Sequence, residues 1–242
     1  MLYLRKLESF NSVQFRGPGI LTIVQDEEES LEINAPGYML NEIQSTVVKE
    51  ELLVGYVASS IVSLSAHREK IQYRLKIRNL KQLFVKGSGD VVLPDLDNDQ
   101  FSIVVTGSGV TKVDQLTADR LDVSISGSGR VEVGGDVELQ TVKLSGSGSY
   151  FAEKLVSDFA NVILSGSGQA EITTSDELSA VISGSGLISY SGYPDVYKQI
   201  SGSGSLTRRR RETLSTTNGR RHRYEYDFLG SDMCHCCCVC HC

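Results

Sequence analysis

The chain has 242 residues, with 23 glycines, only 4 prolines and no tryptophan. Many glycines and β-branched residues with few prolines are typical of short strands joined by turns, so we expect an all-β fold. The formal net charge of −6 divides into +3 for residues 208–242 and −9 for the rest of the chain. An acidic body of this kind is unsuited to binding nucleic acid, and none is predicted as a partner.

The first 82 residues alternate apolar and polar side chains over segments such as 12–16 and 71–77, which is typical of half-buried strands. The sequence GPG at 17–19 predicts a turn, and residues 37–44 predict one short helical turn. We expect residues 1–82 to form either the first, irregular coils of a larger repeat or a capping β region. A cap is expected because the end of a stacked repeat exposes strand edges.

A four-residue word, SGSG or a close variant, occurs seven times between residues 86 and 204. Its first glycines are separated by 20, 20, 19, 20, 18 and 18 residues. This spacing is typical of a β-solenoid or β-helix with coils of about 20 residues, and we assign it to residues 83–207, folding as one unit with residues 1–82. The repeated glycines are Gly87, Gly89, Gly107, Gly109, Gly127, Gly129, Gly146, Gly148, Gly166, Gly168, Gly184, Gly186, Gly202 and Gly204.

Apolar residues occupy every second position on both sides of the word, as Val85 and Val91 do around Gly87. If the chain stays extended, both glycines of each word point into the core and allow the backbone to bend there. The central serines then point outward and form a ladder with a spacing of about 4.8 Å. These serines are Ser88, Ser108, Ser128, Ser147, Ser167, Ser185 and Ser203.

The glycine word is interpreted as architectural and not as a phosphate-binding loop, because a strand pattern follows it where such a loop needs a helix N-terminus. No cofactor is predicted. The charged residues expected to face outward stand at different offsets from the word, and no pair of carboxylates recurs at a common offset to suggest an acid/base site. Examples are Asp90, Lys112, Arg130, Lys143 and Glu171. The sequence therefore predicts a protein that is not an enzyme, with a polysaccharide-active β-helix enzyme as the less favoured alternative.

Residues 208–242 are predicted to be a flexible basic tail, because apolar periodicity ends at Leu206 and runs of arginine begin. The tail holds all the cysteines of the chain. They are Cys234, Cys236, Cys237, Cys238, Cys240 and Cys242. Three hypotheses for them stay open: lipid anchoring in combination with the basic residues, binding of a soft metal such as Cu(I) or Zn(II), and thiols that cross-link chains or have no selected role.

Neither a secretory signal nor a membrane-spanning helix is predicted from the sequence, which favours a cytoplasmic or tail-anchored protein. Four segments of the chain carry a resemblance to a known family. They are ESFNSVQFRGPGILTIVQ, IQYRLKIRNLKQLFVKGSGDV, LDVSISGSGRVEV and AVISGSGLISYSGYPDV. From about residue 7 to 206, the chain resembles the family called putative auto-transporter adhesin, head GIN domain. The resemblance implies a β-solenoid-like fold, a place in the cell envelope and an adhesive role, and it implies no catalytic residues.

Together these observations predict a non-enzymatic, adhesin-like solenoid that binds or scaffolds, with a protein or glycan surface as its partner. Association into homo-oligomers is compatible with this prediction. The alternative is an intracellular protein in which the Cys- and Arg-rich tail provides membrane anchoring or metal binding. The solenoid would then be a spacer or an oligomerisation module.

Overall fold

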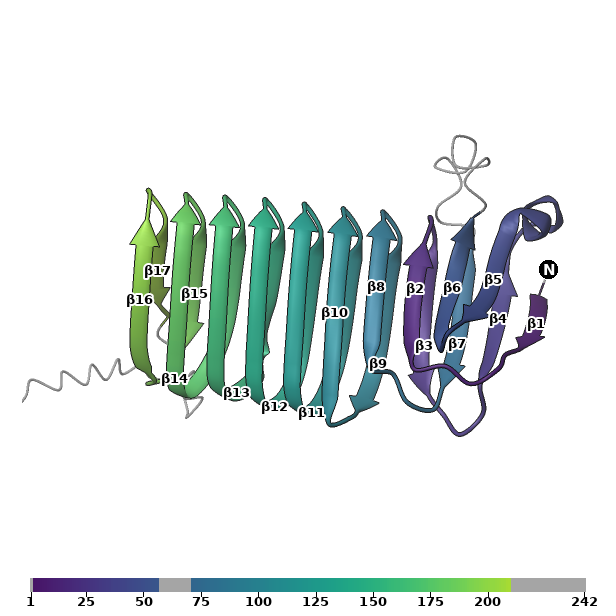
Figure 1. The fold of residues 1–242 in the computed structure, drawn as a ribbon, viewed down its shortest axis with the longest axis horizontal. Coiled ribbons are helices and arrows are strands. Elements are labelled where there is room, and N and C mark those ends of the chain that lie inside the picture. Colours follow the sequence, from purple (N-terminus) through teal and green to yellow (C-terminus); the bar gives the residue numbers. More distant parts are fainter. Residues whose placement is uncertain (1, 57–70, 210–242) are drawn as a thin grey trace, which may run out of the picture. The chain divides into compact units, whose positions relative to one another are not determined.

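A computed structural model of the chain describes residues 2–56 and 71–209, and it is built almost entirely of strands (Figure 1). The described residues are 76% strand and 3% helix, arranged as a β-solenoid. The fold class expected from the sequence is therefore confirmed. The six cysteines and most of the basic tail lie outside the described residues.

Each coil of the repeat contributes one strand to each of two facing sheets. The strand before the glycine word lies in what we call the first sheet, and the strand after it lies in the second sheet. Thus β8 (Gln82–Gly87) leads through the word into β9 (Asp90–Asp97). The following strands are β10 (Gln100–Gly107), β11 (Val110–Gly127), β12 (Arg130–Gly146), β13 (Ser149–Gly166), β14 (Gln169–Gly184), β15 (Leu187–Ser191), β16 (Asp195–Ser201) and β17 (Ser205–Arg208).

The strands β11 to β14 are 16 to 18 residues long because each runs through both sheets and bends between them. In β11, residues 111–117 pair with β9 in the second sheet and residues 120–127 pair with β10 in the first. Both pairings are parallel. One continuous strand therefore links two neighbouring coils at the edge opposite the glycine words.

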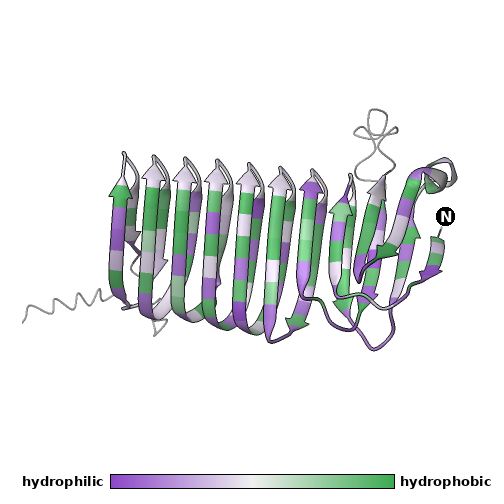
Figure 2. Ribbon diagram, in the orientation of Figure 1, coloured by the Kyte–Doolittle hydropathy of each residue, from purple (hydrophilic) through white to green (hydrophobic). Residues whose placement is uncertain are grey.

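Neighbouring coils are paired in register, so equivalent residues form rows along the stack. Val105 pairs with Val85 on one side and with Ile125 on the other, and all three are buried between the sheets. Figure 2 shows the resulting alternation of apolar and polar residues along each strand. The period-2 pattern in the sequence predicted this core correctly, because successive side chains of a strand point to opposite faces.

The two glycines of each word have different surroundings, and here the structure departs from the expectation that both point into the core. The second glycine is buried: a Cβ added at Gly148 would lie 2.6 Å from Ile125 Cγ2 and 2.9 Å from the carbonyl oxygen of Gly129. The first glycine is exposed or half-exposed and has φ between 104° and 130° in all seven words. A Cβ at Gly146 would face the carbonyl oxygen of Gly127, at 2.8 Å. From Gly107 onward the first glycine thus allows close stacking on the preceding coil, whereas nothing lies within 4 Å of the Cβ position of Gly87.

The central serines are exposed in all seven words, as expected. Their backbones take part in the stacking. The Ser128 and Ser147 N–H groups donate to the carbonyl oxygens of Gly107 and Gly127, each at 3.0 Å. The ladder of parallel pairing therefore continues through the corner of the coil.

An additional coil lies before the first glycine word, formed by β2 (Ser12–Arg16) and β3 (Ile20–Gln25). β2 pairs with β8 and β3 pairs with β9, in both cases in parallel. Arg16 pairs with Lys86, so Gly17-Pro18-Gly19 takes the place of a Gly-Ser-Gly corner. The turn predicted at 17–19 is therefore a corner of the solenoid itself.

The chain then places the next elements on the far side of this coil. β6 and β7 pair in parallel with β2 and β3, and antiparallel strands follow beyond them: β5 on β6, β4 on β7 and β1 on β4. The short helical turn predicted at 37–44 is present as a 3₁₀ helix. These elements are β1 (Leu2–Lys6), β4 (Ser30–Asn34), η1 (Gly37–Glu42), β5 (Ile43–Val48), β6 (Glu51–Tyr56) and β7 (Gln72–Ile77). The antiparallel strands cover the N-terminal end of the stack.

The C-terminal end of the solenoid is protected against pairing with another strand edge in a different way. Within the described residues β16 and β17 each pair with strands of earlier coils only, and Val196 and Ile200 are 37% and 39% exposed. Lys198 pairs with buried Ala180, and Arg208 pairs with Tyr190, so both charges occupy rows that are apolar in earlier coils. Charged side chains in inward positions of an edge strand discourage another edge from pairing with it. The last coil is thus built to end the stack.

Replacing Lys198 by valine should increase self-association, because it restores an apolar row on an open edge. We expect larger species to appear with rising protein concentration in sedimentation velocity runs. Lys143→Val is the matched control, since Lys143 is exposed on the outer face of an interior coil of the same sheet. Equal association of the two variants would contradict the assigned role of Lys198.

Gly148→Ala should lower the free energy of unfolding by at least about 2 kcal/mol, because the new methyl group overlaps Ile125 and the backbone of Gly129. Gly37→Ala is the control, as nothing lies within 4 Å of its Cβ position. Urea unfolding measures both. A Gly148 variant as stable as the Gly37 variant would show that the corner tolerates a side chain.

Candidate functional site

The candidate site is the outer face of the second sheet, where charged side chains from neighbouring coils gather. Of the charged residues expected to face outward, Lys112, Arg130 and Glu171 all lie on this face, in β11, β12 and β14. Asp90 lies on the same sheet in β9, whereas Lys143 belongs to the part of β12 in the first sheet. Solenoid stacking therefore places on one face residues that are 18 to 59 positions apart in the chain.

A shallow depression of about 320 Å³ lies at the centre of this face. It is bounded by three neighbouring strands, β11, β12 and β13. Gly134 and Phe151 belong to its lining. Its charged lining residues are Lys112, Asp114, Arg130, Glu132, Glu153 and Lys154. Three positive and three negative groups give the depression no net formal charge.

The depression arises from an irregularity in β12. The pairing of β12 with β11 shifts between Val113 and Leu116, and its pairing with β13 shifts between Glu132 and Gly134. In both cases two residues of the neighbouring strand lie opposite one residue of β12. The neighbouring strand therefore forms a β-bulge at this place. Gly134 lines the depression without a side chain, and its backbone lies so close to β11 that a Cβ there would be 2.7 Å from the carbonyl oxygen of Asp114. A missing residue and a missing side chain together leave the surface hollow.

The side chains around the depression hold one another in place. Lys112 Nζ lies 2.5 Å from Asp114 Oδ1, and Arg130 Nη1 lies 3.4 Å from Glu132 Oε1. The guanidinium carbon of Arg130 is 4.9 Å from the centre of the Phe151 ring, in a cation–π contact. The hydrogen bond to Asp114 raises the pKa of Lys112, which keeps this lysine positively charged. The depression therefore presents oriented donors and acceptors next to an aromatic ring.

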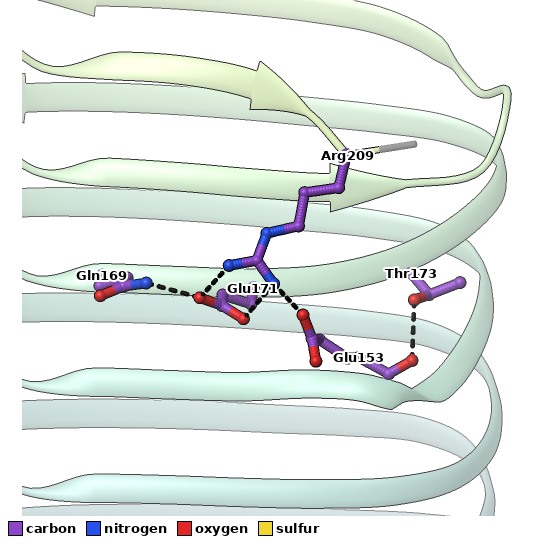
Figure 3. A network of polar contacts seen from close by, with 5 residues as sticks. All are labelled: Glu153, Gln169, Glu171, Thr173 and Arg209. Atoms are coloured by element: carbon purple, nitrogen blue, oxygen red, sulfur yellow. Dashed lines mark hydrogen bonds and ion pairs between the residues drawn. The ribbon is translucent and has the colours of Figure 1, made fainter. Parts of the chain in front are cut away.

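A second group of polar contacts borders the depression and fixes the last coil to earlier ones (Figure 3). Arg209 follows β17 and donates through Nη1 and Nη2 to the two carboxylate oxygens of Glu171, at 2.8 and 2.7 Å. It also contacts Glu153 of the depression. The side-chain amide of Gln169 donates to Glu171 Oε1 at 2.5 Å. One arginine thus joins the end of the described chain to β14 and β13.

Glu171 is only 6% exposed, and this burial raises the pKa of its carboxyl group above the ordinary value of 4.5. A hydrogen bond with Glu153 acts in the same direction, while the charge of Arg209 lowers the pKa. An acid with a raised pKa binds its proton more tightly in the folded chain than in the unfolded chain. The free energy of unfolding therefore rises as the pH falls through the folded-state pKa towards 4.5.

The residues singled out from the sequence lie elsewhere, at the corners of the coils. The repeated glycines and the exposed serines form one edge of the solenoid and do not line the depression. The cysteines lie outside the described residues. Within residues 2–56 and 71–209, no group of three metal-ligating side chains is placed to hold an ion, and no helix is long and apolar enough to cross a membrane.

The sequence did contain a signal for the depression. The interval between Gly127 and Gly146 is 19 residues where its neighbours are 20, and the shortened coil contains the pair Gly134-Gly135. Gly135 has a φ of 120°, and a Cβ there would lie 2.0 Å from the carbonyl oxygen of Leu116. A short coil with two adjacent glycines away from the word thus marks an irregular place on the surface.

Replacing Arg209 by alanine should destabilise the last coil, because it leaves the buried Glu171 carboxylate without its strongest partner. We expect a loss of about 1 kcal/mol or more at pH 8, which shrinks as the pH falls and Glu171 becomes protonated. Urea unfolding at several pH values measures this. Adding Glu171→Gln should restore stability at pH 8, and Arg120→Ala, which breaks an exposed pair with Asp122, is the control. A deficit that does not vary with pH would contradict this account.

Comparisons with known proteins agree with the geometry. A putative adhesin from Bacteroides fragilis has 24% sequence identity and a TM-score of 0.79, over 86% of this chain and 95% of that one. One from Parabacteroides merdae has 20% identity and a TM-score of 0.69, over 87% and 96%. A protein from Parabacteroides distasonis described as a putative lipid binding protein has 21% identity and a TM-score of 0.68, over 87% and 96%. At these identities the likeness shows the fold alone.

No curated protein matches the chain. The model of one family matches residues 9–194, which confirms the resemblance seen in the sequence. Because this match covers most of its length, the chain belongs to the putative auto-transporter adhesin, head GIN domain family.

Proposed function

We propose that the protein is a non-enzymatic, adhesin-like module that binds a surface partner through the outer face of its second sheet. The family and the fold are adhesin-like. The single observation that carries the proposal is the charge-balanced depression between β11, β12 and β13, with Phe151 and Arg130 in contact at its border. The partner is a protein or a glycan.

The construction of this face supports binding. β12 is paired with a strand on each side, in register except at the two shifts next to Gly134, so the backbone that carries the outward side chains is held on both sides. A site held on strands loses little conformational freedom when a partner binds, which favours affinity. The ion pairs Lys112–Asp114 and Arg130–Glu132 further restrict their side chains before contact. Preorganisation of this kind serves recognition without requiring any chemical step.

The full chain, with its six cysteines replaced by serine, should still bind its target. This variant removes the thiols on which tail-based function depends and leaves the described solenoid unchanged. The measurement is saturable binding to arrays of glycans and cell-surface proteins, compared with the unchanged chain. Phospholipid vesicles are included to detect attachment through the tail.

Three outcomes separate the alternatives. Equal array binding by the two proteins supports the solenoid as the binding module. Vesicle or metal association that disappears with the cysteines, without any array binding, would instead support a tail-anchored or metal-binding protein in which the solenoid is a spacer. Turnover of a polysaccharide, abolished by removal of one outward charge, would overturn the non-enzymatic proposal.

A further inference from the structure

We propose that the depression between β11, β12 and β13 binds an uncharged saccharide unit of a glycan chain. The inference rests on the proposed function and names the class of ligand for the same face. It is argued from the charge, the shape and the side-chain contacts of the depression.

The charge of the lining favours an uncharged ligand. The three acidic and three basic side chains of the depression cancel, and two of the bases are already paired with acids, Lys112 with Asp114 and Arg130 with Glu132. An anion would have to compete with these carboxylates, and a cation with the ammonium and guanidinium groups. The body of the chain carries a formal charge of −9, which further disfavours polyanions.

The arrangement of donors and acceptors favours vicinal hydroxyl groups. A hydroxyl group both donates and accepts, so a pair of adjacent hydroxyls can accept from the guanidinium of Arg130 and donate to the carboxylate of Glu132. Charged partners form shorter and stronger hydrogen bonds than neutral ones. The two side chains lie side by side, with Arg130 Nη1 3.4 Å from Glu132 Oε1, so one sugar edge can contact both.

The aromatic ring provides the apolar part of such a site. Phe151 is half-buried in the lining, and Arg130 lies over it at 4.9 Å, which holds the guanidinium in a defined orientation. A sugar ring presents C–H groups as well as hydroxyls, and apolar contact with an aromatic ring combined with a few oriented polar groups is the usual composition of a small-molecule site. Phe151 lines the depression and is only partly buried, so part of its ring is open to a ligand.

The shape favours one unit of a longer chain. At about 320 Å³ the depression lies at the lower end of the range for small-molecule sites. It lies on the outer face of a sheet, so a glycan can enter along the face and continue beyond it. We expect a single unit to bind weakly, with dissociation constants in the millimolar range, and multivalent display to strengthen attachment.

The test uses the full chain and uncharged hexasaccharides of glucose, mannose, galactose and N-acetylglucosamine. Saturation-transfer NMR and calorimetry measure binding at up to ten millimolar saccharide. An acidic hexasaccharide of galacturonic acid and a mixed-charge peptide library serve as competing classes. We expect at least one uncharged saccharide to bind and the acidic one to bind more weakly.

Two pairs of variants locate the site. Phe151→Ala is matched with Phe159→Ala, because Phe159 is an exposed aromatic residue of the same strand outside the depression. Arg130→Gln is matched with Arg120→Gln, because Arg120 also pairs with an acid two residues later, on the first sheet. We expect the first member of each pair to weaken saccharide binding about tenfold or more and the second to leave it unchanged.

The proposal is overturned if no uncharged saccharide binds, if the acidic saccharide or a peptide binds more tightly, or if the members of both pairs behave alike. Unchanged circular dichroism and melting temperature show that a variant is folded, and Arg130→Gln serves if Phe151→Ala unfolds. Array binding that persists when no uncharged saccharide competes would leave the adhesin-like function intact and reject the saccharide as its ligand. Loss of all array binding would reject both.

Discussion

The structure depends on the direct stacking of glycine backbones at one corner of every coil. The positions for a Cβ at Gly107, Gly127, Gly146 and Gly166 all lie within 2.3 to 2.8 Å of the preceding coil's carbonyl oxygen, so no other residue fits without a shift. The corner is therefore the most rigidly registered part of the coil. Any difference in coil length has to be accommodated elsewhere. The 19-residue coil between Gly127 and Gly146 shows this, because its missing residue appears as the bulge next to Gly134, in the second sheet. The glycine word and the depression are thus linked. Because the corner keeps its register, the residue missing from the short coil is missing from the face where the charged residues gather.

Much of the fold could be predicted from the sequence because the period-2 pattern and the period near 20 report on two independent directions, across the sheets and along the stack. The inward rows, the exposed serines and the solenoid class follow from them. The prediction that the first glycine points into the core is wrong. The pattern assumes an extended chain, whereas Gly87 and its equivalents have positive φ. The sequence did not indicate that β2 and β3 form a coil of the solenoid, because Pro18 replaces the serine of the repeat word. In addition, the strands that flank this coil come from later in the chain. Contacts of that kind are set by tertiary packing and leave no local signal.

The site was only partly visible from the sequence. The sequence pattern places Lys112, Arg130 and Glu171 on the outside, and their scattered offsets predict only that no pair of carboxylates recurs at a common offset. In the stack, offsets matter less than the shared face, because coils are separated only by the spacing of neighbouring strands, about 4.8 Å. Residues at different offsets, such as Arg130 and Phe151, therefore come into contact across the boundary between coils. Arg209 was assigned to the flexible tail, yet its guanidinium reaches Glu171 and Glu153. Arg208 of the same run also has a partner, the ring of Tyr193 at 3.7 Å, so the run of arginines alone did not indicate which of its members make contacts.

Both ends of the solenoid are protected against pairing with further strands, so its side faces are the surfaces available for partners. Antiparallel strands close the N-terminal end, and Lys198 and Arg208 place charges in the inward rows at the other. Pairing of a further coil at that end would bury these charges between apolar rows, at a cost that exceeds the gain of a few strand hydrogen bonds. Growth along the stack is thereby opposed, and recognition is left to side chains that point away from the core. On the outer face of the second sheet these side chains balance in charge within the depression, although the body as a whole is strongly acidic. Long-range attraction then contributes little, so affinity must come from short-range hydrogen bonds and contact with Phe151, which is the form of recognition that suits an uncharged, hydroxyl-rich ligand.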